Sequence, residues 1–476
     1  MNGRAVLGAG AVLMLGGCAL NGVEPPASQI PVPADWAQSE VAPLSTDLTQ
    51  YWTLLGDPVL SGFVEQAIIE NRDLAVGIAR LDRARAGLRI ARAGYLPSAG
   101  LSAGATRDVG DFADDDIGFT VGADASWEID LFGQISNNVA ASRADLASAG
   151  YSLADLQRLI VGQVAVQTIT ARAIAEQLAI ARSTLAFQED NLQLARWRNQ
   201  AGLVSSLDVE QARTQRAQTA ASIPLLESNL AATANAISVL IGEPPGRVLD
   251  TIQGTEPEPV PSPPLLTRYE APAQVLQRRP DVRAAEADLF ASAARIGVAR
   301  ADLLPAARIT GSIGTAGTAG TLFDIITGNL FAGLTQLIFD GGRTASRIDG
   351  AEADARASLA AYEQAILGAL QDVESAAVDQ RAAADRVIIN EEALDAAQNS
   401  AFLARTQYEA GLIDFQTLLI VENQLLSARN QLVGAQSDRA TAFVRLTQAL
   451  GGGWSAADYD FPLPGTDVRQ DDRIAE

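Results

Sequence analysis

The side chains that most often perform catalysis are scarce in this chain of 476 residues. It contains no His and a single Cys, and all 35 basic residues are Arg rather than Lys. Composition therefore excludes acid–base catalysis by His, zinc sites built from His and Cys, and P-loops, which need Lys. Carboxylate, Ser and Arg chemistry remains, and it would need polar side chains that converge on one site. We expect no enzymatic activity, no cofactor and no metal site.

The single Cys stands at position 18, at the end of the stretch MNGRAVLGAGAVLMLGGC. A basic residue followed by an apolar stretch too short to span a bilayer is typical of a secretory signal. Leu-Gly-Gly-Cys resembles the lipobox of bacterial lipoproteins, which implies that residues 1–17 are a signal peptide and that Cys18 is lipidated. The alternative is a free Cys buried in a helix. Position 19 is Ala rather than Asp, which by the same resemblance favours the outer membrane of a Gram-negative bacterium.

The charge is strongly acidic, with a formal net value of -22. Nucleic acid is a poor partner for such a chain. The densest acidic run is DVGDFADDD, from Asp108 to Asp116. We interpret it as a solvated external loop between two strands, with cation binding as the alternative.

The stretch FTVGADASWEIDLFG, from Phe119 to Gly133, alternates apolar residues with small or polar ones. This period predicts a strand with Phe119, Val121 and Trp127 on one face. An amphipathic strand on a soluble core is one reading. The stretch is longer than the five or six residues of an average soluble strand, however, and suits the roughly 9 to 11 residues that a tilted strand needs to cross a bilayer. We therefore predict that the apolar face contacts lipid.

The chain is duplicated. ARAGYLP at 91–97 recurs as ARADLLP at 299–305, and ARWRNQAGLVSSLDVEQA at 195–212 is matched by ARTQYEAGLIDFQTLLIV at 404–421. Two distant matches with nearly the same spacing indicate a tandem repeat. We expect the following segments: the signal peptide, a Pro-rich N-terminal segment (18–57), repeat 1 (58–250), a Pro-rich linker (251–271), repeat 2 (272–453) and a C-terminal segment (454–476).

Each repeat is predicted to contain a helix, two strands, a long helix and a further helix. The expected strands are 101–107, 117–131, 307–314 and 330–339, and the expected long helices are 135–200 and 343–409. At about 1.5 Å per residue each long helix spans roughly 100 Å, so these helices must form a rod or tube. Apolar residues in the second one follow coiled-coil spacing, and we assign them to helix packing: Leu359, Tyr362, Ile366, Ala369, Val373 and Ala376.

Four strands cannot close a membrane barrel, because bacterial barrels have at least eight and no edge can be left open in lipid. Three copies would supply twelve strands. The expected fold is therefore mainly α with a small β part: a trimeric helical tunnel joined to a 12-stranded transmembrane β-barrel, with four strands from each chain.

Motifs spread over nearly the whole chain resemble the lipoprotein branch of the TolC-like outer membrane factor family, the OprM/NodT-like efflux lipoproteins. Besides Leu-Gly-Gly-Cys, the matching stretches are SWEIDLFG, AGLVSSLDVEQA, IPLLESNLA, RRPDVRAAE, IGVARADLLP, IFDGGR and YEAGL. The resemblance implies a homotrimeric duct in the outer membrane that crosses the periplasm. The implied partners are a periplasmic adaptor and an inner-membrane RND-type transporter, and the duct conducts drugs or other small molecules passively.

Two other functions stay open. A type I protein-secretion exit duct would share the fold and differ in cargo. A non-channel periplasmic coiled-coil lipoprotein would explain the helices and Cys18, but not the alternating strands.

The resemblance also implies roles for residues near the Ala-Gly-Leu breaks. Tyr408 and Asp208 match a pair that can form a latch by hydrogen bonding, although Ser205 and Asp208 also have capping-box spacing, so Asp208 could serve its own helix start alone. Asp414, at the position of Ser205 in the other repeat, is predicted to be an N-cap.

The periplasmic constriction is expected at Gln416, Thr417 and Ile420. In the family pattern the residue matching Gln416 is often apolar and the residue matching Ile420 is often Asp, so this chain departs from both. An isoleucine ring could close by excluding water and would bind cations less than an Asp ring. The alternative is that Ile420 packs against a neighbouring helix.

Overall fold

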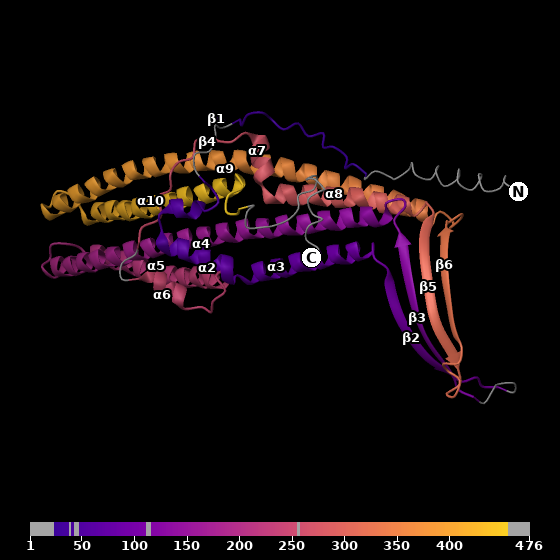
Figure 1. Ribbon diagram of the computed structural model, residues 1–476. Coiled ribbons are helices and arrows are strands. Elements are labelled where there is room, and N and C mark those ends of the chain that lie inside the picture. Colours follow the sequence, from indigo (N-terminus) through magenta and orange to yellow (C-terminus); the bar gives the residue numbers. More distant parts are fainter. Residues whose placement is uncertain (1–22, 38–39, 42–46, 111–115, 255–257, 456–476) are drawn as a thin grey trace.

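The computed structural model describes residues 23–37, 40–41, 47–110, 116–254 and 258–455. Long helices run side by side along one axis, and a sheet extends from one end of them at a steep angle (Figure 1). The expected mainly helical fold with a small sheet is therefore confirmed. Cys18 and most of the acidic loop lie outside the described residues.

The two repeats have matching elements. The first contains α3 (Arg72–Ala93), β2 (Ser98–Thr106), β3 (Gly118–Ile129), α4 (Gln134–Gln200) and α5 (Ser206–Leu240). The second contains α8 (Pro280–Ala301), β5 (Ala306–Gly317), β6 (Ile326–Thr335), α9 (Arg343–Glu409) and α10 (Phe415–Ala449). Corresponding helices have equal lengths of 22, 67 and 35 residues. This equality means that the second repeat reproduces the helical geometry of the first.

Shorter elements lie outside this pattern. They are β1 (Glu40–Val41), a 3-10 helix (Tyr51–Leu55), α2 (Pro58–Glu70), α6 (Arg247–Gln253), β4 (Arg268–Tyr269) and α7 (Pro272–Arg278). β1 pairs with β4 in a parallel bridge. The 3-10 helix places Tyr51 in the core, where its ring contacts Phe443 near the C-terminal end of α10 and is fully buried.

The predicted bounds hold closely for the long helices and less well for the last strand. We expected that strand at 330–339, but β6 ends at Thr335. The reason is its partner: Thr335 pairs with Ala306, the first residue of β5, so no β5 residue remains to pair with positions beyond it. The first strand is also shifted, from the expected 101–107 to Ser98–Thr106.

The sheet is antiparallel throughout, in the order β2-β3-β5-β6. The helices nearest the sheet follow the same order, because α3 packs on α4, α4 on α8, and α8 on α9. Toward the opposite end, α5 and α10 pack on α4, and α10 packs on α9. α4 and α9 thus run the full length of the helical layer. Beside them, α3 and α5 follow each other along one line, and α8 and α10 follow each other along another.

These paired helices meet end to end. Asn71, the N-cap of α3, donates from its amide to the carbonyl of Leu240, the last residue of α5, at 2.8 Å. Arg279, at the matching position before α8, donates to the carbonyl of Ala449, the last residue of α10, at 3.2 Å. The last carbonyls of a helix lack partners within it. Each junction therefore satisfies a helix end with the side chain that begins the next helix.

Candidate functional site

The end farthest from the sheet consists of two helical hairpins, α4–α5 and α9–α10 (Figure 1). Each hairpin turns at an Ala-Gly-Leu break, where Gly202 and Gly411 have φ of 74° and 75°. This left-handed conformation is strained for residues with a Cβ, which explains why both breaks carry glycine. The matching turns put the two α5 and α10 helix starts at one end of the molecule.

Polar side chains cap both helix starts. Ser205 and Asp208 form a complete capping box at α5: the Asp208 amide donates to the Ser205 hydroxyl at 3.3 Å, and the Ser205 amide donates to the Asp208 carboxylate at 2.9 Å. At α10, the Thr417 amide donates to Asp414 at 2.7 Å. Bonds from the hydroxyl and the amide of Thr417 hold the pKa of Asp414 below its ordinary value. Both caps arise from spacing of three residues, which is local to each helix.

Tyr408 and Asp208 do not bond each other within this chain. The Tyr408 hydroxyl is buried and has no hydrogen-bond partner among the described residues, and the Asp208 carboxylate is engaged by Ser205. The Tyr408 ring instead packs against Phe415, with centroids 5.5 Å apart, and the Arg198 guanidinium lies 4.6 Å from its centroid. The ring belongs to an apolar cluster with members from both hairpins, and its packing there accounts for the burial of Tyr408.

Because this hydroxyl has no partner, Tyr408→Phe is expected to leave the thermal midpoint unchanged within about 2 °C, whereas Tyr408→Ala, which removes the ring, should destabilise the tip by about 3–5 kcal/mol. Thermal unfolding followed by circular dichroism in detergent measures both. A loss in the Phe variant comparable to that in the Ala variant would mean that the hydroxyl has a partner in the native assembly.

The residues assigned to the constriction lie on one exposed face of α10. Gln416 and Thr417 are exposed, and Ile420 is 49% exposed. The opposite face packs into the hairpins through buried residues, namely Phe415, Leu418 and Leu425. About half of the Ile420 surface is therefore open within its own chain.

Two contacts near this face were not predicted from the sequence. Arg405 of α9 binds Glu422 of α10 through two hydrogen bonds, one of them 2.9 Å from Nη2 to Oε2. The bonds from Glu422 raise the pKa of Arg405. The amides of Gln215 and Asn423 bond each other and link α5 to α10. The Arg405–Glu422 pair could have been found from the sequence, because opposite charges lie on either side of one turn. The amide pair could not, because its residues are 208 positions apart.

The sheet has two chemically distinct faces. Its register puts Phe119, Val121 and Trp127 on the same face as apolar or small residues of the other strands: Ala99, Leu101, Ala103, Ala307, Ile309, Ile313, Leu330, Ala332 and Leu334. The opposite face carries polar or small residues, with Phe331 as an exception: Ser98, Ser102, Thr120, Asp124, Glu128, Arg308, Thr310, Ser312 and Asn329. The Trp127 indole donates to the Tyr95 carbonyl at 2.9 Å. One face therefore suits lipid and the other water.

Residues 100–104 match the G-x-S-x-G pattern of hydrolase nucleophiles, which needs a sharp turn between a strand and a helix. Ser102 instead lies within β2 and bonds the Gly122 carbonyl at 3.3 Å. Within the described ranges, no cluster of metal-ligating side chains is present. No helix of the described chain is long and apolar enough to span a bilayer.

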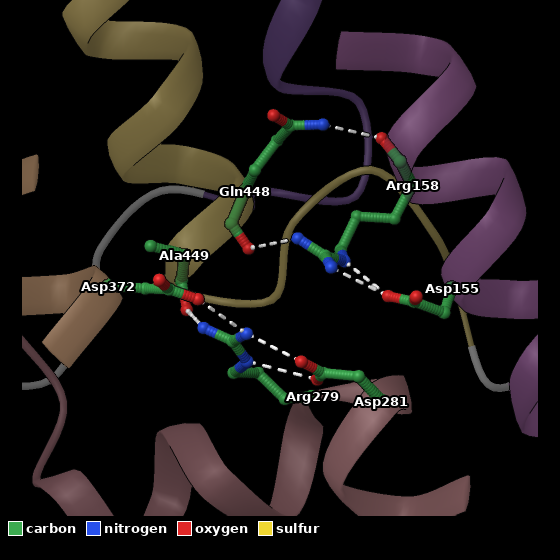
Figure 2. A network of polar contacts seen from close by, with 7 residues as sticks. All are labelled: Asp155, Arg158, Arg279, Asp281, Asp372, Gln448 and Ala449. Atoms are coloured by element: carbon green, nitrogen blue, oxygen red, sulfur yellow. Dashed lines mark hydrogen bonds and ion pairs between the residues drawn. The ribbon is translucent and has the colours of Figure 1, made fainter. Parts of the chain in front are cut away.

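The motif RRPDVRAAE acquires a structural role at the end of α10 (Figure 2). Arg158 donates to the carbonyl of Gln448 at 3.2 Å, Arg279 to that of Ala449, and Arg278 to that of Leu450 at 2.9 Å. These are successive carbonyls at a helix C-terminus, where cations are favoured. We call these three arginines the α10 clamp.

Carboxylates neutralise the clamp. Arg279 is 2% exposed and bonds Asp281 at 3.0 Å and Asp372 at 2.9 Å, while Arg158 bonds Asp155 at 2.9 Å (Figure 2). Burial by itself would lower the pKa of Arg279, but the bonds to Asp281 and Asp372 outweigh it and raise that pKa. The guanidinium therefore stays charged in the core and ties α8, α9 and α10 together.

The N-terminal segment lies along α9. The Ser28 hydroxyl and the Gln29 amide donate to Glu363 at 3.3 and 3.1 Å, and the Ala37 amide donates to Glu374 at 2.6 Å. α9 begins at the sheet, so the segment runs toward the sheet as it approaches the N-terminus. The Trp36 indole holds it by donating to the Glu270 carbonyl at 2.8 Å.

Known proteins share this architecture. The chain is 30% identical over 466 residues to the pyoverdine export outer membrane protein OpmQ of Pseudomonas aeruginosa, covering 94% of this chain and 96% of that protein. It is 29% identical over 459 residues to nodulation protein T of Rhizobium leguminosarum bv. trifolii, covering 93% of this chain and 96% of the relative. The solved outer-membrane channel OprN is 30% identical with a TM-score of 0.81, covering 91% of this chain and 99% of OprN.

The family model described as outer membrane efflux protein matches residues 63–243 and 271–452, one match in each repeat. These two matches cover most of the chain and coincide with the duplicated elements. They agree with the two-faced sheet, the paired hairpins and the similarity to solved channels. The chain belongs to the outer membrane efflux protein family.

Proposed function

We propose that three copies of this chain form the outer-membrane exit duct of a tripartite efflux pump, which conducts small molecules passively from a periplasmic adaptor and an inner-membrane RND-type transporter. The observation that supports this best is the sheet. All four strands turn apolar residues to one face and polar residues to the other, as a barrel wall between lipid and water requires.

The open edges of the sheet support a ring of copies. β2 and β6 are its edge strands, and their side chains are almost entirely exposed, with Leu101 at 81% and Leu330 at 82%. An unpaired edge is not tolerated in lipid, so β2 of one copy must pair with β6 of the next. Three copies give twelve strands, which is enough to close a bacterial barrel.

The cargo is proposed to be small molecules rather than proteins. Two relatives are named for export of pyoverdine and for efflux of toluene, and both of these are small molecules. A type I protein-secretion duct remains the second candidate, because it would use the same fold. A non-channel coiled-coil lipoprotein leaves the two faces of the sheet unexplained. The duct itself is proposed to do no chemistry.

Cys18 is proposed to carry the lipid anchor, and chain geometry permits it. Ser28 binds Glu363, which is twenty residues, or about 30 Å, along α9 from Arg343 at the sheet end. The ten residues from Cys18 to Ser28 can span at most about 33–36 Å. An acylated Cys18 can therefore reach the membrane beside the barrel. Intact mass spectrometry tests this, and a mass that retains residues 1–17 or lacks added acyl chains contradicts the anchor.

Conductance across planar lipid bilayers tests the duct itself. We expect the purified protein to form discrete, long-lived ion channels, whereas a scaffold lipoprotein would leave the bilayer insulating. Purified protein that is trimeric and correctly inserted but forms no conducting state under any applied voltage would contradict the duct.

The same bilayers test the constriction assigned to Ile420. Ile420→Asp is expected to create block by divalent cations added from the periplasmic side, because a ring of three carboxylates attracts cations. Glu422→Gln is the control, since Glu422 is bound by Arg405 and turned away from that face. Block that responds to Glu422→Gln but not to Ile420→Asp would mean that another face of α10 lines the pore.

A further inference from the structure

The helical layer next to the sheet ends in two faces of opposite charge. α3 packs on α4, and its other face carries arginines; the helix contains six Arg and two Asp. Arg80, Arg83 and Arg89 are exposed, and they have no hydrogen-bond or ion-pair partner in the described part of the chain. At the other edge of the layer, α9 exposes Asp349 and Asp354, which likewise have no partner among the described residues.

The face of α9 around these two aspartates is built from small residues. They are Ser346, Gly350, Ala353, Ala357 and Ala360, all of them exposed. Such a surface leaves room for long side chains from a facing helix. The unpaired arginines of α3 have the charge and the length to fill it.

The internal duplication indicates how the two faces meet. Within one chain, the long helix of repeat 1, α4, packs on the short helix of repeat 2, α8. If the copies close into a ring, the long helix of repeat 2, α9, must pack on the short helix of repeat 1, α3, of the next copy. The α4–α8 contact is therefore a template for the contact between copies. α8 begins 208 positions after α3, and α9 begins 209 positions after α4.

Two contacts of α4 with α8 set the register. Gly297 lies so close to Asn137 that an added Cβ would come within 2.6 Å of that side chain, and Ala287 shares an apolar cluster with Tyr151. Subtracting 208 from each α8 position gives the matching α3 position, and adding 209 to each α4 position gives the matching α9 position. The first contact then becomes Arg89 beside Ser346, and the second becomes Ala79 beside Ala360. Interpolation between these two points puts Arg83 opposite Asp354, and Asp349 lies one helical turn from Ser346.

We infer that Arg83 and Arg89 of one copy form ion pairs with Asp354 and Asp349 of the next, which makes α3 and α9 a charge-matched seam between copies. This inference rests on the ring assembly proposed above. The template position of Arg83 is Ala291, which is fully buried within the chain. Arg83 is thus buried on assembly, where an unpaired cation is costly. The seam consequently selects the partner face: α3 cannot pack on a surface that lacks carboxylates at these positions.

Charge reversal and exchange test the pairs. We expect Arg83→Asp and Asp354→Arg each to lower the yield of SDS-resistant trimers in outer membranes by about tenfold or more, because like charges then face each other. The double variant, with the charges exchanged, is expected to recover to within about twofold of the wild type. Arg80→Asp is the control on the same helix, since its template position, Asp288, is exposed within the chain, and its yield should stay within about twofold.

A designed disulfide separates failure of the pairs from failure of the ring. With both Ala79→Cys and Ala360→Cys, the ring predicts covalent trimers in the oxidising periplasm. Ala79→Cys with Ala345→Cys, fifteen residues and about 22 Å away along α9, should give none. Covalent trimers together with unaffected yields in both charge reversals would overturn the ion pairs and leave the ring intact. Reversals that the exchanged double variant does not rescue would also overturn the pairs, and absence of the covalent trimers would overturn the ring.

Discussion

Val121→Arg is expected to abolish assembly in the outer membrane, whereas Thr120→Arg is tolerated. Val121 lies on the apolar face of β3 between Ala103 and Thr315, and Thr120 lies on the polar face beside Gly104. An arginine on a lipid-facing strand position costs on the order of 2 kcal/mol, and a trimer would carry three of them. The yield of SDS-resistant trimers measures the difference.

The two substitutions are matched because they add the same side chain at adjacent positions of one strand. Their effects therefore differ only through the face that each residue occupies. Equal yields at both positions would contradict a membrane-spanning strand. A loss restricted to Thr120→Arg would mean that the polar face, rather than the apolar one, contacts lipid.

Arg279→Met is expected to reduce the free energy of unfolding by about 1–3 kcal/mol, because it removes a buried cation and leaves the partly buried carboxylate of Asp281 without its partner. Arg279 bonds Asp281, Asp372 and the carbonyl of Ala449, so its loss uncouples α8, α9 and α10 at one point. Arg300→Ala is the control: its pair with Glu352 is exposed on both sides and should contribute less than about 1 kcal/mol. Denaturant unfolding in detergent compares the two, and similar losses would contradict a structural role for the α10 clamp.

The same clamp predicts a dependence on pH. Burial alone would raise the pKa of Asp281, but Arg279 outweighs it and holds that pKa below 3.8. A carboxyl group whose pKa is lower in the folded state than in the unfolded state stabilises the folded protein fully when the pH is above the unfolded-state pKa. That stabilisation is lost as the pH falls through the folded-state pKa. Stability from this pair is therefore complete at neutral pH and declines only in acid below about pH 4. In Arg279→Met this acid-dependent component should disappear.

Local patterns determined most of what the sequence predicted correctly. The two 67-residue helices and the alternation at Phe119–Ile129 depend on periodicity within a segment. The caps at Ser205 and Asp414 depend on residues three positions apart. Signals of this kind survive in the sequence because the interacting groups belong to one element. Together with the number of strands, they were sufficient to predict a membrane barrel joined to a helical tube, and the duct function was implied by the family resemblance.

Contacts between distant segments were decided only by the tertiary structure. Tyr408 was expected to bond Asp208, but packing of its ring against Phe415 left the hydroxyl without a partner among the described residues. The α10 clamp joins Arg279 to a carbonyl 170 positions away. Such pairings depend on the relative orientation and register of packed helices, which the spacing of residues along the chain does not determine. The sequence by itself determined the elements and their order, and packing decided which side chains meet, because a side chain's partner is set by the face that its helix buries.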